Sequence, residues 1–373
     1  MKKIFNPEYK NNRKKYFSDI SDDKWNDWQW QIDNRITEAN QLKNFFQNID
    51  VEAINKVSER FSFSVTPYFL SLINNDTPLN DPVGKQIIPD IREFKYDSRL
   101  ILDPFKEENE RSPIRGVVQR YPDRIILVTT NFCPAKCRYC TRKWNWDKCQ
   151  VLTLPMLENV VAYLKKHPEI REVILTGGEP FLLNLDFLDS VLSAISSVES
   201  IEVIRIGSRI LSFLPQRITD DVISILSKYS PIWIVTHFNH PNEFTPDTEK
   251  AVKKILSAGC ALCNQSVLLK EVNDSVDVMK ELVHALQNIL IKPYYIFHPD
   301  LIEGTSHFRG SINDGIQIMK GLRGYTGGIC VPYYVVDLPE GGKIPLLPEY
   351  ILKEDEKGFL FSNYEGKEIF YSR

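Results

Sequence analysis

The sequence predicts an α/β fold in which six parallel strands form a partial barrel. From about residue 115, short apolar runs rich in β-branched residues alternate with longer stretches of helical periodicity. Repeated strand-then-helix units imply parallel strands joined by crossover helices. Polar residues also gather just after several of these strands, as they do at the mouth of a barrel. Six units suit a three-quarter, TIM-like (β/α)6 barrel, and a doubly wound sheet is the alternative that fits the same pattern.

The barrel is expected over residues 115–335, between an N-terminal helical region at 1–114 and a short C-terminal segment at 336–373. Thr219 marks the start of one predicted helix, and Gly259 follows the end of another, as a C-cap does. The predicted strands are Arg124–Thr130, Glu172–Thr176, Glu202–Ile206, Ile232–Thr236, Cys263–Leu269 and Lys292–Phe297. The predicted helices between them are Leu154–Lys166, Asp186–Ser197, Thr219–Lys228 and Thr248–Ala258.

The N-terminal region is expected to be helical and largely polar. Trp25, Trp28 and Ile32 recur at helical spacing, which predicts one apolar face docked on the body of the protein. Farther along, a helix is predicted to begin at Pro67 with Thr66 as its N-cap. These tryptophans are therefore interpreted as core residues rather than as a binding site.

Composition excludes several classes of function. The 373 residues are 43% hydrophobic and 25% charged, which is typical of a soluble globular protein. A net charge of −3 argues against a nucleic-acid partner, which would need a basic excess. The N-terminal residues lack the apolar run of a signal peptide, and no stretch is apolar for long enough to span a membrane. Seven unevenly spaced cysteines suit a reducing compartment, so a cytoplasmic location is predicted.

Three cysteines form the most informative motif of the chain. Cys133, Cys137 and Cys140 have the spacing C-x3-C-x2-C and directly follow the first predicted strand. Thiolates at this spacing can bind three irons of a [4Fe-4S] cluster and leave the fourth iron open for chemistry. A zinc site would need a second pair or histidines nearby, and three clustered thiols cannot all pair in disulfides. The distant Cys260 and Cys263 lie in an apolar stretch that is predicted to be core.

The motif, with the aromatic Tyr139 before its third cysteine, resembles that of the radical S-adenosylmethionine (SAM) enzymes. In that family SAM chelates the open iron. The second predicted strand ends in Gly177, Gly178, Glu179 and Pro180, which resembles the family motif that holds the amino group of SAM. Without that resemblance, Gly-Gly-Glu-Pro would be equally typical of a turn. Further candidate cofactor contacts at the ends or starts of later strands are Ser208, Arg209, His237 and Gln265.

Ordered matches over most of the chain give a closer resemblance, to the lysine 2,3-aminomutases. They begin at Trp25-Asn-Asp-Trp28 and continue almost to residue 350. The matching motifs include Arg120-Tyr-Pro-Asp-Arg124, Cys140-Thr-Arg142, Arg205-Ile-Gly-Ser-Arg209, Thr236-His-Phe-Asn-His-Pro-Asn-Glu243 and Asn264-Gln-Ser266.

The resemblance implies pyridoxal 5′-phosphate (PLP) as a further cofactor. In the family, a lysine in a glycine-rich loop after the last barrel strand binds PLP covalently, and the matching residue is Lys343. Arg120 and Arg124, on either side of Tyr121 in the same motif, resemble the family's phosphate contacts, because a guanidinium donates two hydrogen bonds at once. Arg142 resembles the residue that pairs with the substrate α-carboxylate. Without the resemblance, Lys343 would be interpreted as an exposed turn lysine and Arg142 as a surface arginine.

The resemblance also assigns two acidic residues to the substrate. Asp300 and Asp337 match the aspartates that bind the side-chain ammonium of lysine, where glutamate-acting relatives have lysine and asparagine. Two anions in a nearly dry pocket need a cation between them, so a basic amino acid is predicted. L-lysine is the first choice, and arginine or ornithine would satisfy the same acids. Each aspartate alone could equally be a helix cap or a loop ion pair.

The chain departs from the family at several positions. Its PLP loop is one residue shorter and carries Glu340 where the family has glycine. Lys143-Trp144 replaces arginines, and Phe297 replaces a tyrosine near PLP. The family's zinc site between subunits uses a cysteine where this chain has Ser275, together with a cysteine-rich tail. Because no cysteine follows Cys330, no such zinc is predicted.

Together these observations predict a radical SAM, PLP-dependent 2,3-aminomutase, in which Lys343, Arg142, Asp300 and Asp337 carry the catalytic roles. The predicted partners are a small-molecule amino acid, a reductant such as flavodoxin or ferredoxin, and further copies of the chain in a homo-oligomer. Neither nucleic acid nor membrane is expected. One alternative is a radical SAM enzyme on the same scaffold that acts on protein-bound lysine. The other is a non-enzymatic iron–sulfur redox sensor, against which the four catalytic candidates argue.

Overall fold

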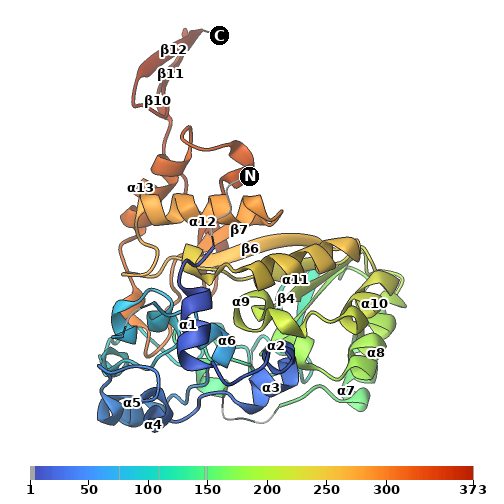
Figure 1. Cartoon of the computed structure of the whole chain (residues 1–373). Coiled ribbons are helices and arrows are strands. Elements are labelled where there is room, and N and C mark those ends of the chain that lie inside the picture. Colours follow the sequence, from blue (N-terminus) through green and yellow to red (C-terminus); the bar gives the residue numbers. More distant parts are fainter. Residues whose placement is uncertain (1–4, 75, 109, 147, 149, 373) are drawn as a thin grey trace.

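The centre of the protein is a nine-stranded sheet that curves into an open barrel (Figure 1). The computed structural model describes residues 5–74, 76–108, 110–146, 148 and 150–372. The strands follow one another in chain order, so the sheet does not reverse direction as a doubly wound sheet does. The strands β2 to β8 are parallel, whereas β1 and β9 are antiparallel to their neighbours. The strands are β1 (Val117–Tyr121), β2 (Arg124–Thr130), β3 (Glu172–Gly177), β4 (Val203–Gly207), β5 (Trp233–Thr236), β6 (Ala261–Val267), β7 (Lys292–Phe297), β8 (Tyr333–Leu338) and β9 (Gly342–Pro345).

The six predicted strands are confirmed to within two residues. β2 and β7 have the predicted bounds, and β6 begins and ends two residues earlier than predicted. The sequence prediction missed β1, β8 and β9. β9 has no buried residue, so it lacks the apolar signal of a strand. β8 extends the parallel barrel by one strand and carries Asp337.

Helices cover the outer face of the barrel strands and share one core with them (Figure 1). Thr219 caps the predicted start of α10, where its hydroxyl accepts from the backbone N–H of Val222. Gly259 follows α11 with φ +76°, as expected for a residue after a helix end. The barrel helices are α7 (Leu154–Lys166), α8 (Leu185–Ser196), α9 (Ile210–Phe213), α10 (Asp220–Lys228), α11 (Pro246–Ser257), α12 (Val276–Asn288) and α13 (Ile312–Leu322).

The N-terminal helices form a second core that lies against the cysteine loop. This core includes Ala135 of that loop and Phe213 of α9. The Phe69 ring meets the Phe213 ring edge-on, with 4.8 Å between centroids. As predicted, a helix begins at Pro67, and Thr66 caps it by accepting from the Phe69 backbone N–H. The helices are α1 (Tyr9–Tyr16), α2 (Asp22–Asn26), α3 (Trp28–Asp33), α4 (Ala39–Leu42), α5 (Val51–Ser58) and α6 (Pro67–Leu70).

Trp25, Trp28 and Ile32 were predicted to share one face of a single helix that docks on the body. The single helix is wrong, whereas the docking of the two tryptophans is confirmed. Asp27 ends α2 and caps α3, because its side chain accepts from the backbone N–H of Gln29. Trp25 is nevertheless fully buried, and Trp28 packs against the barrel core. The two tryptophans therefore belong to consecutive short helices that both contact the body.

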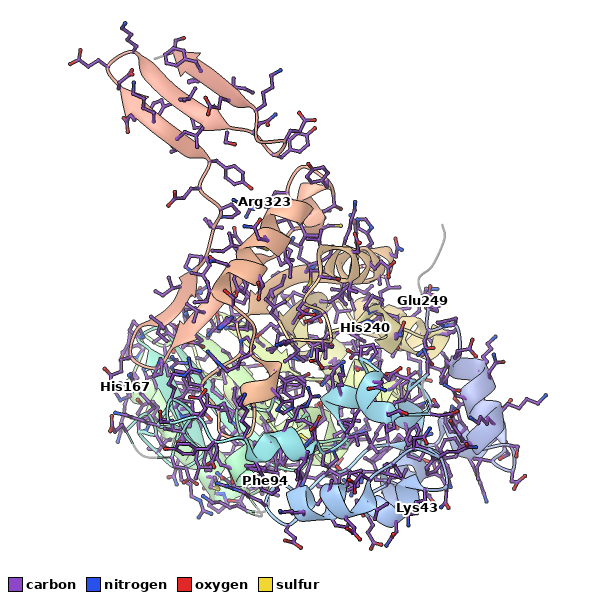
Figure 2. All side chains as sticks on the ribbon, turned by 90° about the vertical axis from the view of Figure 1, so that its left-hand side faces the viewer. Lys43, Phe94, His167, His240, Glu249 and Arg323 are labelled. Atoms are coloured by element: carbon purple, nitrogen blue, oxygen red, sulfur yellow. The ribbon has the colours of Figure 1, made fainter. Side chains whose placement is uncertain are left out.

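Residues 351–372 of the C-terminal segment form a separate antiparallel sheet that projects from the barrel, whereas the start of the segment belongs to β8 and β9 of the main sheet (Figures 1 and 2). It consists of β10 (Ile351–Asp355), β11 (Gly358–Ser362) and β12 (Glu368–Ser372). Every residue of β10 and β12 is exposed. Among the described residues, no helix is both long and apolar enough to cross a membrane.

Candidate active site

A cavity of about 380 Å³ opens at the C-terminal ends of the barrel strands. Its wall contains sulfur, carboxylate, guanidinium and amine groups from almost every strand end. The predicted site residues that line it are Cys133, Cys137, Cys140, Arg142, Arg120, Gly177, Gly178, Glu179, Ser208, Arg209, His237, Gln265, Asp300, Asp337 and Lys343. The predicted residues Tyr121, Arg124 and Pro180 are not part of the lining, although Tyr121 and Pro180 directly follow the lining residues Arg120 and Glu179 in the chain.

The three cysteines follow β2, and hydrogen-bond donors of other residues lie beside two of their sulfurs. Arg209 Nη1 donates to Cys137 Sγ at 3.0 Å, and the backbone N–H of Arg142 donates to Cys140 Sγ at 3.4 Å. Burial raises the pKa of the Cys133 thiol well above its usual value, and that of Cys140 to about 11. A bound metal displaces such thiol protons, because a coordinated sulfur is deprotonated.

The residues around these sulfurs fit an iron–sulfur cluster better than a single metal ion. Within the part of the chain that the structure describes, no three Cys, His, Asp or Glu side chains group closely enough to hold one ion. In a [4Fe-4S] cluster each cysteine binds a different iron, so its sulfurs stand apart. Three cysteines in one cavity wall, with N–H donors beside two of the sulfurs, meet that requirement.

The paired glycines after β3 bring two backbones together. A Cβ at Gly177, where φ is +120°, would lie 2.4 Å from the carbonyl oxygen of Thr130. A Cβ at Gly178 would lie 2.3 Å from the carbonyl oxygen of Phe132. The glycines are therefore required for the end of β3 to contact the start of the cysteine loop, in addition to any ligand that approaches them in the cavity.

Glu179 links the ends of β3 and β4. Its carboxylate accepts from the Ser208 hydroxyl at 2.7 Å and from the backbone N–H groups of Arg209 and Phe181 at 3.0 and 3.2 Å. Burial raises the pKa of this carboxyl to about 7. A carboxylate offers about four acceptor sites, so these three bonds leave one for a ligand ammonium.

Tyr139 joins the cysteine loop to strand ends across the cavity. Its hydroxyl bonds His237 Nε2 at 3.0 Å and accepts from the Asn239 side-chain amide at 2.6 Å. The rings of Tyr139 and His237 stack with 5.7 Å between centroids. Burial and the nearby Arg209 charge hold the pKa of His237 well below its usual value, so the ring stays neutral. Arg209 also donates to the Tyr139 hydroxyl.

Sequence reasoning did not single out the residues that hold Arg209 in place. Its Nη2 donates to Gln86 Oε1 at 2.6 Å and to Glu243 Oε2 at 3.0 Å. Glu243 is the last residue of the Thr236–Glu243 motif that resembles the family, but its place in the sequence gives no sign of this contact. Gln86 lies in a proline-rich connection that carries no periodic signal. Together they orient Arg209 toward the cysteine sulfur.

Arg142 is paired with a carboxylate that the sequence reasoning also missed. Its Nε and Nη2 donate to the two oxygens of Glu107 at 2.7 and 2.9 Å. The side chains of Arg142 and Glu107 are only 15% and 13% exposed. Glu107 lies in the irregular segment before β1, where an acidic residue gives no sign of its partner.

Lys343 lies in the cavity wall and is held by the opposite edge of the sheet. It is part of β9, and its backbone N–H donates to the Tyr121 hydroxyl of β1 at 3.0 Å. Its Nζ lies 3.4 Å from Asp337 Oδ2. Arg120 Nη1 and Nη2 donate to the two oxygens of the same Asp337 at 3.1 and 2.9 Å. The candidate PLP lysine, a candidate phosphate ligand and a candidate substrate acid therefore meet at one point.

Asp300 has a buried oxygen without a partner. Its Oδ1 is sealed from solvent and makes no hydrogen bond within the described structure. Burial raises the pKa of Asp300 to about 7, and the Asp337 charge adds to the shift against the opposing charges of Arg120 and Lys343. A buried orphan acceptor is costly, so this position is suited to a cation that enters from the cavity.

Comparisons with known proteins agree with this geometry. The Radical SAM superfamily matches residues 127–283, and the family described as Lysine-2,3-aminomutase matches residues 319–372. An L-lysine 2,3-aminomutase of Fusobacterium nucleatum is 41% identical over 360 residues, which cover 95% of this chain and 84% of that protein. The chain belongs to the lysine 2,3-aminomutase family.

Other members of the lysine 2,3-aminomutase family are about equally similar. An L-lysine 2,3-aminomutase of Clostridium subterminale is 40% identical over 366 residues, covering 97% of this chain and 88% of that protein. A glutamate 2,3-aminomutase of Clostridioides difficile is 38% identical over 353 residues, covering 94% and 83%. The family therefore includes members named for different amino acids, while the [4Fe-4S] cluster, SAM and PLP are cofactors of the family as a whole.

Three positions that depart from the lysine 2,3-aminomutase pattern differ in their distance from the cavity. Phe297 lines the cavity, and its ring centroid is 5.8 Å from Lys343 Nζ. Lys143 is buried behind the cysteine loop, where its Nζ donates to Glu93 and to the carbonyl oxygen of Gly304. Glu340 is exposed at the hairpin tip. Of these, only Phe297 lines the cavity.

Arg124 is placed differently from Arg120. Its guanidinium lies over the Tyr121 ring, 3.9 Å from the centroid, and pairs with Asp123 at 2.9 Å. Of the two arginines Arg120 and Arg124, Arg120 lines the cavity and Arg124 does not. The assignment of Arg124 as a phosphate ligand of this lysine 2,3-aminomutase family member stays a prediction.

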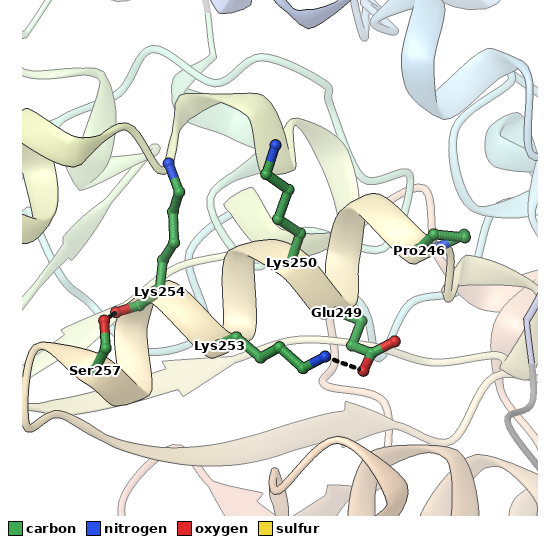
Figure 3. A pocket seen from close by; sticks show the side chains of 6 residues that line it. All are labelled: Pro246, Glu249, Lys250, Lys253, Lys254 and Ser257. Carbon is green, nitrogen blue, oxygen red and sulfur yellow. Dashed lines mark hydrogen bonds and ion pairs between the residues drawn. The ribbon is translucent and has the colours of Figure 1, made fainter. Parts of the chain in front are cut away.

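A second hollow, on the outer side of α11, lacks the chemistry of a catalytic site (Figure 3). Figure 3 shows long charged side chains that point outward from the helix, with Lys253 paired to Glu249 at 2.7 Å. It contains neither sulfur nor the buried acids of the central cavity. Its lining residues are Pro246, Glu249, Lys250, Lys253, Lys254 and Ser257.

Proposed function

We propose that this chain is a radical SAM, PLP-dependent 2,3-aminomutase that moves the α-amino group of L-lysine to the β-carbon. The observation that carries the choice of a basic amino acid is the unpartnered, buried oxygen of Asp300 in the cavity that also contains Lys343 and Arg142. A lysine side-chain ammonium would give this oxygen the partner it lacks. Arginine and ornithine are the alternatives that satisfy the same acid.

The residues of the cavity divide the binding of cofactors among them. Cys133, Cys137 and Cys140 would hold the cluster, and Lys343 would hold PLP. Bound together, the cluster with SAM supplies the hydrogen-abstracting radical, and PLP supplies the conjugated system across which the nitrogen migrates. Arg120 is already cationic and faces the cavity, so its guanidinium can exchange Asp337 for a phosphate.

One cationic and two anionic groups can fix the substrate at both ends. Arg142 would pair with the α-carboxylate, while Asp300 and Asp337 would bind the side-chain ammonium. Fixing both ends leaves only the central carbons free to face the reacting groups, which is how an enzyme turns binding into regioselectivity. The wall that carries Phe297 adds an apolar surface against the methylene groups.

The experiment combines activity with a matched acid variant. Anaerobically reconstituted protein with SAM, PLP and a reductant is incubated with L-lysine, L-arginine, L-ornithine or L-glutamate, and products are identified by mass spectrometry. We expect β-lysine as the main product. Asp300→Asn should raise KM for lysine at least about tenfold, since an uncompensated buried charge typically costs 2–5 kcal/mol, whereas the exposed Asp355→Asn should behave as wild type. No β-amino acid from any basic substrate would contradict the proposal.

The proposal also includes a protein reductant and an oligomeric assembly. The cluster must accept an electron from outside, so a flavodoxin or ferredoxin is the proposed reductant, in a cytoplasmic setting. A homo-oligomer is the proposed assembly, and the exposed apolar side chains of the small C-terminal sheet support it.

A further inference from the structure

The ion pair between Glu107 and Arg142 stands between two cavities. Both side chains line the central cavity. Both also line a neighbouring cavity of about 670 Å³ on the side of β1 and Trp144, which is distinct from the hollow on α11. The pair is therefore part of the shared wall. A purely structural pair would not need to face the site, whereas this pair presents the arginine directly to it.

The hydrogen bonds leave one edge of the guanidinium open. Glu107 accepts from Nε and from Nη2, so it occupies the side edge of Arg142. Within the described structure, no hydrogen bond joins the remaining Nη1 to a side chain. A guanidinium carries five N–H donors in a rigid plane, and the edge formed by Nη1 and Nη2 matches a second carboxylate. Because the guanidinium is rigid, fixing its Nε edge against Glu107 also fixes the direction of its Nη edge.

The segment that carries Glu107 is attached to the cavity at several points. Phe105 is buried, and the Arg120 guanidinium carbon lies 4.4 Å from its ring centroid. Glu108 pairs with Lys148 beyond the cysteine loop. The backbone N–H of Arg142 in turn bonds Cys140 Sγ. The segment therefore contacts two of the three arginines that are expected to bind anions, Arg120 and Arg142, and it reaches Arg142 next to a cluster ligand.

The pair is shielded from solvent, because the side chains of Arg142 and Glu107 are only 15% and 13% exposed. An arginine guanidinium stays charged in proteins, so the partner of Arg142 sets its orientation rather than its charge. Without Glu107, the same guanidinium would keep its charge but lose the bonds that fix its plane.

We propose that Glu107 is a positioning residue, which holds Arg142 by its Nε edge so that the Nη edge receives the α-carboxylate of a free amino acid. The inference rests on the proposed function and deepens it, because a site aimed in this way selects free amino acids over peptide-bound lysine. Glu107 does not touch the substrate itself. Its effect is limited to the carboxylate end, and the side-chain ammonium is bound by other residues.

The test measures binding rather than turnover. Dissociation constants of L-lysine and L-lysinamide, which lacks the carboxylate, are determined by equilibrium dialysis on protein loaded with cluster and PLP but without SAM. Glu107→Gln keeps the size of the side chain and removes its charge. The matched control is Glu108→Gln, the neighbouring acid, whose side chain is 45% exposed.

We expect Glu107→Gln to weaken L-lysine about tenfold while L-lysinamide changes less than about twofold, because only the first ligand uses the Arg142 edge. Glu108→Gln should leave both constants unchanged. Equal weakening of both ligands would show a general structural role and overturn the inference, and so would no change for either. Failure of the proposed function looks different, because the wild type would then form no β-lysine.

Discussion

Arg120 and Asp337 form a two-point ion pair that joins β1 to β8. β1 and β8 lie toward opposite edges of the sheet. The side chains of Arg120 and Asp337 are only 10% and 9% exposed. Asp337 also attracts Lys343, at 3.4 Å. Asp337 is therefore already neutralised by cations of the chain, whereas Asp300 is not, so the two acids assigned to the substrate are not equivalent.

This inequality predicts a pH-dependent stability of the cofactor-free protein. The pKa of Asp300 is raised by burial from 3.8 to about 7, so the folded state holds a proton that the unfolded state has lost between these values. The contribution of Asp300 to the unfolding free energy should therefore fall as pH rises from about 4 to 7 and then level off. Asp300→Asn should be more stable than wild type by roughly 1–3 kcal/mol at pH 8 and about equal at pH 4, measured by denaturant titration. A difference that does not vary with pH would contradict this assignment.

Lys343→Ala should abolish both PLP retention and aminomutase activity. The side chain is 31% exposed, so the variant is expected to fold. The measurement is the visible absorbance of PLP that remains after gel filtration, together with product formation. Lys106→Ala, an exposed lysine whose Nζ lies 3.8 Å from Glu340, is the control and should keep both. An active Lys343→Ala enzyme would favour a different radical SAM reaction on this scaffold.

Arg209→Met should make the cluster harder to reduce. Arg209 donates to Cys137 Sγ at 3.0 Å, and hydrogen bonds and positive charge near a cluster sulfur stabilise the reduced state. Potentiometric titration followed by electron paramagnetic resonance should show a more negative midpoint potential. Arg171→Met, which removes an exposed arginine paired with Glu202, should leave the potential unchanged. An unchanged potential in Arg209→Met would mean that the bond to sulfur has no electronic effect.

The chain is expected to be an oligomer through its C-terminal sheet. Apolar side chains such as Phe370 and Leu352 are 55% and 48% exposed there, and an isolated three-stranded sheet needs a partner for such surface. Light scattering should give a mass above the 43.3 kDa of one chain. Phe370→Glu should shift the mass toward the monomer, whereas Tyr96→Glu, at an exposed position in the N-terminal region, should not. A monomeric wild type would rule out the prediction.

The strands of the barrel could be predicted because each is an apolar run with a clear boundary. β9 could not, because a four-residue strand at an edge buries too little to leave a periodic signal. Lys343 was nevertheless singled out from the family resemblance, and the structure places it in the cavity wall, while its role in binding PLP stays a prediction.

The partners of the site residues were the hardest part to predict. Cys133, Cys137 and Cys140 were found because thiol spacing is itself a chemical signal. Gln86, Glu107 and Glu243 were not assigned, because a single acid or amide in an irregular segment gives no indication of what it contacts. Such pairings are set by tertiary packing and become visible only in three dimensions.

The two edges of the barrel meet at a seam that is closed by side chains. Across it, Arg120 reaches Asp337 and the Tyr121 hydroxyl reaches the backbone of Lys343, with no ladder of hydrogen bonds between β1 and β9. Separating the seam would therefore cost a few side-chain contacts and leave every strand pairing intact. Arg120 and Lys343 close the seam and are also proposed to bind PLP, so loading the coenzyme would replace some of the contacts that join the two edges of the sheet.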